Sequence, residues 1–285
     1  GVVKIGAGAF AYNRPLSKIP DSWGDLEEIA GKLFNGSGLT SLPKSWGKVK
    51  SVGESSFSGS KLSEIPESWE DITFIGNYAF SSNKITKIPS SWGKVELNRI
   101  NSDIYRNNFL EGVFFNNHIT KLDFSWEGWP AIPDDLFRNN HLTSIPDSWK
   151  NVKSIGQMAF YDNRLTTLPD SWGKISQIEY RCFTGNQITT IPDSWGNVTG
   201  IREQAFSSNK IAKLPDSWGK ITKIDKHAFY GNSLTQLPDS WGEVSSLGEG
   251  VFEENQLTKL SAPWGKITTI PKNAFSHNEL IAIPS

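Results

Sequence analysis

Residues 163–217 read NRLTTLPDSWGKISQIEYRCFTG, then NQITTIPDSWGNVTGIREQAFSS, then NKIAKLPDS. The same unit returns every 23 residues, and one tryptophan in each unit makes the spacing easy to follow. A fixed period of about 20 to 50 residues indicates a repeat architecture, in which each unit packs only on its neighbours. The tryptophans on this spacing are Trp23, Trp46, Trp69 and Trp92 and, after a break, Trp126, Trp149, Trp172, Trp195, Trp218, Trp241 and Trp264.

Each unit carries four apolar marks: a Leu/Ile pair three residues apart, the tryptophan, a second apolar pair three apart, and Ala-Phe. Because these positions must face one another between coils, they predict a leucine-rich solenoid of about twelve 23-residue units, a single domain over residues 1–285. We expect a short parallel strand at each LTxLP segment, with the ITxI segment as a candidate second strand, and a helical turn at Ala-Phe. One complete set of marks is Ile211/Leu214, Trp218, Ile221/Ile224 and Ala228-Phe229.

An asparagine follows the phenylalanine by three residues in ten units, and Ser37 and Ser60 take its place in the other two. We expect this side chain to be buried, because its amide can both donate and accept hydrogen bonds to backbone groups of adjacent coils. The ten are Asn13, Asn83, Asn117, Asn140, Asn163, Asn186, Asn209, Asn232, Asn255 and Asn278.

Composition excludes several classes of function. The net charge of −1, with both signs interspersed, gives no basic patch for nucleic acid or an anionic membrane. No apolar run approaches 20 residues, so we expect no membrane insertion by this segment. Cys182 is the one cysteine, which excludes an intramolecular disulfide. Neither end reads as a polar capping unit, so we expect a fragment of a longer chain.

The marks resemble those of leucine-rich repeat proteins, most closely the BspA-like bacterial surface type. The resemblance is carried by the LTxLP segments at 165–169 and 234–238, the run IGQMAF at 155–160, and Asn163. The Asp-Ser-Trp-Gly segment after the proline departs from the family pattern. The resemblance implies a cell-surface or secreted solenoid that displays a surface for adhesion or for binding a protein partner, such as a host extracellular protein. It implies no catalytic activity.

The period breaks once, because Trp92 and Trp126 are 34 residues apart rather than 23. The extra residues lie near 96–106 (ELNRINSDIYR). Insertions in solenoids form loops on one face, often the binding face, and local aromatic residues suit an interface hot spot. The alternative is a tolerated bulge that packs its own aromatic side chains. The candidate partner-binding residues are Tyr105, Phe109, Phe115, Phe124 and Trp129.

Other columns of residues have alternative interpretations. The tryptophan column could form a glycan-stacking ladder on the surface, but we expect it in the core, where Trp repeated with Leu and Phe is usually buried. His118 and His141 lie one repeat apart and could hold a metal, but no Cys, Asp or Glu column completes a ligand set, so we expect a solvated surface. Cys182 stands in the small-residue slot before Phe183 and is expected to be an inert buried thiol.

The threonines of the LTxL segments could form a flat array for ice or a crystalline polymer, but β-propensity on an exposed strand explains them more simply. Lysine and alanine interrupt the neighbouring positions, as at Ala212, Lys213 and Lys259. The threonine column comprises Thr40, Thr86, Thr120, Thr143, Thr166, Thr189, Thr235 and Thr258.

Nucleotide-binding, zinc-protease and serine-hydrolase motifs are absent from the sequence, so we expect no enzyme, no cofactor and no metal. The favoured hypothesis is a protein-binding or adhesion module of a bacterial cell-surface protein. Two alternatives stay open: a carbohydrate-binding solenoid that uses exposed aromatic residues, and a passive structural spacer.

Overall fold

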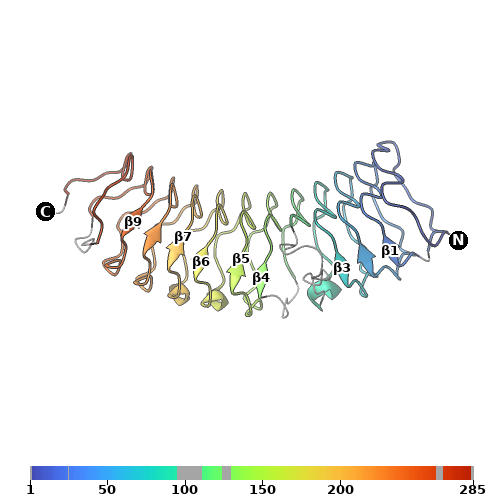
Figure 1. Cartoon of the computed structure of the whole chain (residues 1–285), viewed down its shortest axis with the longest axis horizontal. Helices are drawn as coiled ribbons and strands as arrows, with labels where there is room; N and C mark the ends of the chain where they lie inside the picture. The colour runs from blue at the N-terminus through green and yellow to red at the C-terminus, as the bar shows by residue number, and fades with distance from the viewer. Residues whose placement is uncertain (1, 25, 95–110, 124–129, 261–265, 284–285) are drawn as a thin grey trace. The chain divides into compact units, whose positions relative to one another are not determined.

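The computed structural model describes residues 2–24, 26–94, 111–123, 130–260 and 266–283. The chain forms two compact units. Unit 1 consists of Gly1–Trp129 and Pro133–Leu142, and unit 2 consists of Pro130–Ile132 and Thr143–Ser285. Within each unit, successive coils of chain lie side by side as a β-solenoid (Figure 1). The single domain predicted over residues 1–285 stays a prediction.

The regular strands are two residues long and pair in parallel with a register of one repeat, as in Ile201 opposite Ile224. Strands β1 to β3 form one sheet in unit 1, while β4 with β5 and β6 to β9 form two sheets in unit 2. Within the described ranges these nine strands are fewer than the twelve units predicted. Their bounds are β1 Glu28–Ile29, β2 Ser51–Val52, β3 Phe74–Ile75, β4 Ala131–Ile132, β5 Ser154–Ile155, β6 Gln177–Ile178, β7 Gly200–Ile201, β8 Lys223–Ile224 and β9 Ser246–Leu247.

All nine strands lie at the second apolar pair of their repeats, so the placement of the main strand at LTxLP was wrong. Among the described residues, the LTxLP segments contain one isolated bridge, Thr190 with Lys213. The reason is visible in the hydrogen bonds. The N–H of the first apolar residue, such as Ile188, donates to the side chain of Asn209 at 3.0 Å rather than to a neighbouring carbonyl. A side chain therefore interrupts the ladder that a regular strand requires.

The sequence predicted a helical turn at Ala-Phe, and this placement was wrong. The helical turns form instead at the tryptophan, as at Asp-Ser-Trp. Three short 3-10 helices occur in the described residues: η1 Ser90–Lys94, η2 Asp170–Trp172 and η3 Asp193–Trp195. The two that begin at aspartate each follow a proline in extended conformation, Pro169 or Pro192. Because proline fixes its own φ and cannot donate a hydrogen bond, it suits the position just before such a turn. The tryptophan N–H then donates to the proline carbonyl, as in Trp195 to Pro192 at 3.2 Å.

The Ala-Phe segment is instead a turn with two left-handed residues four positions apart. The described chain contains 17 non-glycine and 7 glycine residues with positive φ, and they fall in such pairs, for example Met158 with Asp162 and Gln204 with Ser208. Alternate N–H groups of the turn donate to the next repeat, as in Phe206 to the carbonyl of Ala228 at 2.9 Å. These bonds fix the register of the turns in consecutive repeats.

The core consists of aromatic columns that run through the repeats. Eight tryptophans of the 23-residue column are at most 2 % exposed, and Trp23 is half-buried. The phenylalanines of the Ala-Phe segments stack as parallel, offset rings between repeats, with centroids 5.7 Å apart for Phe160 and Phe183. Such offset stacking stabilises the pair beyond simple burial. The expectation that the tryptophans form the core is confirmed for these eight, which rules them out as a surface ladder for glycans.

The buried asparagines connect each repeat to the one before it, as expected. Asn209 accepts the N–H of Ile188 at 3.0 Å, and its Nδ2 donates to the carbonyls of Phe183 at 2.9 Å and Phe206 at 3.1 Å. The same three bonds recur at Asn83, Asn117, Asn140, Asn186, Asn232, Asn255 and Asn278. The amide uses both its acceptor and its donors. It therefore supplies hydrogen-bond partners to backbone groups that have none in the interrupted ladder.

Candidate partner-binding surface

Phe115 is the one candidate partner-binding residue that falls within the described ranges. Tyr105, Phe109, Phe124 and Trp129 lie outside them. The side chain of Phe115 is half-buried on the turn side of its coil in unit 1. The guanidinium carbon of Arg138 lies 5.1 Å from the centre of the Phe115 ring, within the range of a cation–π contact. Phe115 and Arg138 are 23 residues apart, so they occupy the same position in consecutive repeats.

A buried carboxylate holds Arg138 in place. Asp135 is 8 % exposed, and its Oδ1 lies 3.2 Å from Nη1 of Arg138. Burial raises the pKa of Asp135, and the neighbouring guanidinium works against that rise. The ion pair restricts a long side chain that would otherwise sample many rotamers, so the aromatic–arginine contact is pre-formed.

Tyr78 and Glu111 extend the same surface. The Tyr78 hydroxyl donates a hydrogen bond to the Glu111 carboxylate, and the Glu111 N–H donates to Oδ1 of Asn77 at 3.1 Å. Burial and the adjacent carboxylate of Glu111 both raise the pKa of the Tyr78 hydroxyl. The ring of Tyr78 lies over Gly112, where a Cβ would overlap it. Glycine is therefore required at this position for the tyrosine to lie flat on the next repeat.

These contacts define what we call the Phe115 surface: Tyr78, Glu111, Phe115, Asp135 and Arg138. It combines aromatic rings with one cation and two carboxylates, and most of its polar groups are already hydrogen-bonded to one another. The sequence indicated Phe115 through its double aromatic with Phe114 but missed the other four residues. The 23-residue spacing could have identified Arg138, because residues one repeat apart are neighbours on adjacent coils.

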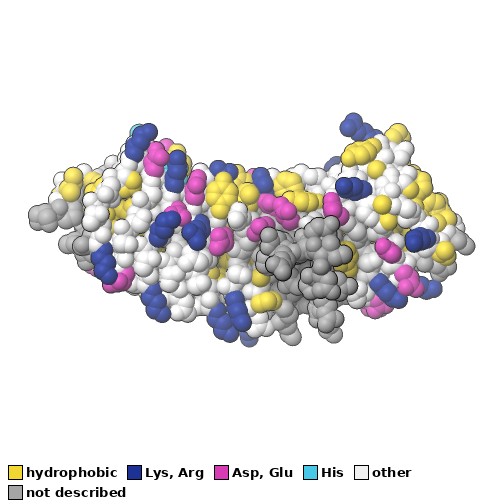
Figure 2. Space-filling model, in the orientation of Figure 1, with side chains coloured by type: hydrophobic (Ala, Val, Ile, Leu, Met, Phe, Trp, Pro, Cys, Tyr) yellow, Lys and Arg dark blue, Asp and Glu magenta, His cyan; other side chains and the backbone are white. Residues whose placement is uncertain are grey.

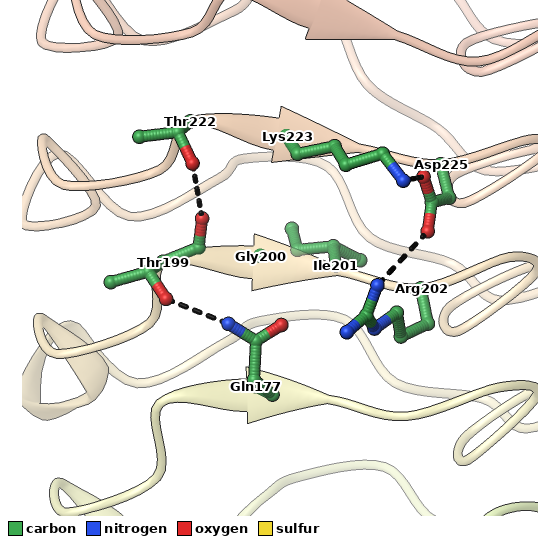
Figure 3. A pocket seen from close by; sticks show the side chains of 8 residues that line it. All are labelled: Gln177, Thr199, Gly200, Ile201, Arg202, Thr222, Lys223 and Asp225. Carbon is green, nitrogen blue, oxygen red and sulfur yellow. Dashed lines mark hydrogen bonds and ion pairs between the residues drawn. The ribbon is translucent and has the colours of Figure 1, made fainter.

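A second feature is a shallow hollow of about 200 Å³ on the strand face of unit 2 (Figure 3). It exists because Gly200 interrupts a column of larger side chains between Gln177 and Lys223. The amide of Gln177 occupies the space above Gly200, where it donates to Oγ1 of Thr199 at 2.7 Å. In turn, Oγ1 of Thr222 donates to the carbonyl of Thr199 at 3.3 Å.

The charged groups of the hollow satisfy one another. Asp225 lies 2.7 Å from Nζ of Lys223 and 3.8 Å from Nη1 of Arg202 (Figure 3). The hollow is also smaller than the roughly 300 to 1,000 Å³ of small-molecule pockets. On the face that Figure 2 shows, basic and acidic side chains are interspersed, as the sequence indicated. The hollow is therefore a weaker candidate for a binding site than the Phe115 surface.

The remaining candidates have structural explanations. Cys182 is fully buried, as expected of an inert thiol. His118 and His141 stack with ring centroids 5.2 Å apart. Across the described part of the chain, no group of three or more His, Cys, Asp or Glu side chains is arranged to hold a metal ion. The same part of the chain contains no helix with the length and hydropathy needed to span a membrane.

Comparison with known proteins agrees with this geometry. The family described as BspA type leucine-rich repeat region matches residues 3–126, 130–238 and 201–283, in six copies. No curated protein matches the chain.

Similar solved structures include a leucine-rich repeat protein from Leptospira interrogans, with 16 % identity, a TM-score of 0.50, and coverage of 93 % of this chain and 69 % of that one. Another is YopM, a leucine-rich effector protein from Yersinia pestis, with 18 % identity, a TM-score of 0.50, and coverage of 94 % and 70 %. At these identities the likeness shows the fold alone.

Proposed function

Because the chain belongs to the BspA-type leucine-rich repeat family, we propose that it is a non-catalytic protein-binding module that serves adhesion on a bacterial cell surface. Leucine-rich repeat solenoids are generally scaffolds for protein interaction, since each coil adds a strip of surface to an extended face. A host extracellular protein is the partner that best fits an adhesion role.

The observation that carries the proposal is the pre-formed contact between Phe115 and Arg138. Aromatic and arginine side chains dominate the binding energy of protein interfaces. Here the arginine is already fixed by Asp135, so a partner would not have to supply the free energy of ordering it. We place Tyr105, Phe109, Phe124 and Trp129 at the same interface, because they flank Phe115 in the sequence.

The test begins with a panel of purified extracellular proteins, followed by dissociation constants for each protein that binds. Phe115→Ala and Arg138→Ala should each weaken binding about thirtyfold, as expected for a hot spot of about 2 kcal/mol. Deleting residues 96–106 should abolish binding while leaving the thermal midpoint near that of the wild type. Tyr230→Ala is the matched control, because Tyr230 is a half-buried aromatic at the same repeat position in unit 2.

Equal affinity of the wild type, Phe115→Ala and the deletion variant would show that the partner binds elsewhere. A panel without any bound protein would favour the passive spacer. Surface location is tested separately by protease treatment of intact cells of the source organism, which should cleave this protein if it is displayed outside.

A further inference from the structure

A column of basic and imidazole side chains runs along four consecutive LTxL segments of unit 1, one residue in each of these repeats. The backbone fixes it in register, because the N–H of each member donates to the carbonyl of the first apolar residue of the preceding repeat, at 2.8 to 3.0 Å. The stacked imidazoles, 5.2 Å apart and inclined by 15°, confirm that the side chains follow this spacing. The column consists of Lys61, Lys84, His118 and His141.

The lysines of this face are not paired with carboxylates of the described residues. Lys61, Lys84 and the nearby Lys121 are exposed, and no carboxylate of the described residues lies within 4.0 Å of their Nζ atoms. By contrast, Lys87 pairs with Glu67 at 2.9 Å. The segments that carry the column also expose Glu64 and Asp123, so positive charge predominates without being exclusive.

A parallel column of hydroxyl groups lies two residues further along each segment. Within unit 1 these are Ser63, Thr86 and Thr120, and all three are exposed. At the three outward positions of the repeats that carry Lys61, Lys84 and His118, the sequence offers lysine, histidine, serine, threonine and one glutamate, and no aromatic or aliphatic side chain. Protein interfaces usually depend on apolar or aromatic anchors, which this face lacks. Its chemistry suits a hydrophilic partner with repeated negative charges.

We propose that this face, the lysine ladder of Lys61, Lys84 and Lys121 with the stacked imidazoles of His118 and His141 beside it, binds a linear acidic polysaccharide that carries carboxylate or sulfate groups along its chain. A polymer with regularly repeated anions can contact cations on successive coils at once, which multiplies weak individual contacts. The adjacent hydroxyl column supplies hydrogen bonds for sugar hydroxyl groups. This site is separate from the Phe115 surface and does not depend on the proposed protein partner.

The experiment measures binding of the full chain to heparin and to polygalacturonate, with dextran as the neutral control. The wild type should bind both acidic polymers in a manner that weakens as salt rises. The triple variant Lys61→Gln, Lys84→Gln, Lys121→Gln should bind about tenfold more weakly, since exposed ion contacts are individually small. The matched control is Lys150→Gln, Lys153→Gln, Lys174→Gln, which removes the same charge from exposed lysines of unit 2 and should keep wild-type affinity.

Equal thermal midpoints of the two triple variants would confirm that the exposed substitutions leave the fold intact. Absence of salt-dependent binding to both polysaccharides, or equal affinities of the two triple variants, would overturn the proposal. Tighter binding to poly-glutamate or to single-stranded DNA than to the polysaccharides would also overturn it, because the ladder would then serve another class of polyanion.

Discussion

Replacing one buried asparagine with alanine gives the sharpest test of how the repeats are joined. Asn209 is 8 % exposed and contacts backbone groups of two repeats. In Asn209→Ala the N–H of Ile188 loses the side-chain oxygen to which it donates at 3.0 Å. The carbonyls of Phe183 and Phe206 each lose one bond but keep another, to Asn186 and Asn232.

The magnitude follows mainly from these three losses, because the fourth bond of Asn209, to the carbonyl of Ser207, is long at 3.3 Å and that carbonyl keeps the N–H of Gly185. A buried N–H left without a partner costs about 1–3 kcal/mol, and each lost bond to a carbonyl that keeps another partner costs about 0.5 kcal/mol, the low end of the usual range. The free energy of unfolding should therefore fall by about 3 kcal/mol. This is well above the effect of an ordinary surface substitution, about 0.5 kcal/mol.

Urea unfolding followed by tryptophan fluorescence measures the change, and amide hydrogen exchange should show loss of protection at Ile188. Asn197→Ala is the control, because Asn197 is an exposed asparagine of the preceding repeat. It donates to the carbonyl of Gly173 at 2.8 Å and accepts from Nζ of Lys220 at 3.1 Å, both at the surface. If Asn209→Ala costs no more than Asn197→Ala, the asparagines do not join the repeats and the reasoning fails.

Three further changes follow from the same structure. Ser60→Asn should stabilise the protein by about 1 kcal/mol. An amide at this position could accept the Leu39 N–H and donate to the carbonyl of Phe34, to which the Ser60 hydroxyl donates at 3.2 Å. An unchanged urea midpoint would contradict this prediction. Gly185→Ala should destabilise by about 1 kcal/mol, because Gly185 has φ +70° while a Cβ there would make only ordinary contacts with Asp162, at 3.6 Å or more. A neutral effect in the same assay would argue against a left-handed turn. Burial raises the folded-state pKa of Asp135 above its ordinary value of 3.8. The stability that its protonated form contributes is therefore present below pH 3.8 and is lost as pH rises through the raised pKa. Asp135→Asn should lack this loss, and a pH-independent difference in unfolding free energy between the two proteins would refute the prediction.

The sequence predicted the repeat, the buried tryptophan column and the asparagine bonds, because each depends on residue type recurring at a fixed spacing. It misplaced the main strand, since both LTxL and ITxI read as short extended segments with apolar pairs. The buried asparagines, such as Asn209, decide between the two segments. Their side-chain oxygen accepts the N–H that a regular strand at LTxL would donate to a neighbouring strand.

The left-handed turns gave no comparable signal in the sequence. Met158, Arg181 and Gln204 all have positive φ, although such residues rarely adopt it. Their conformation is set by hydrogen bonds to the next repeat, such as Gln204 N–H to the carbonyl of Lys226 at 2.9 Å. A local reading of glycine and proline could not have found a turn that tertiary contacts impose.

The candidate surface was predicted only in part. Phe115 was identified from local aromatic content, whereas its contact with Arg138 depends on alignment between coils. The requirement for glycine at Gly112 also depends on alignment between coils, because it comes from the Tyr78 ring on the preceding coil. Reading the sequence down the columns of the repeat, rather than along the chain, recovers both pairs.

Tryptophan emission with acrylamide quenching, measured on the native protein and again in urea, tests the central claim that the repeats stack around an aromatic core. Eight column tryptophans are at most 2 % exposed, so the native emission should be blue-shifted and weakly quenched, and both properties should be lost on unfolding. Red-shifted, readily quenched emission from the native protein would place the tryptophans on the surface and contradict the packing of the solenoid.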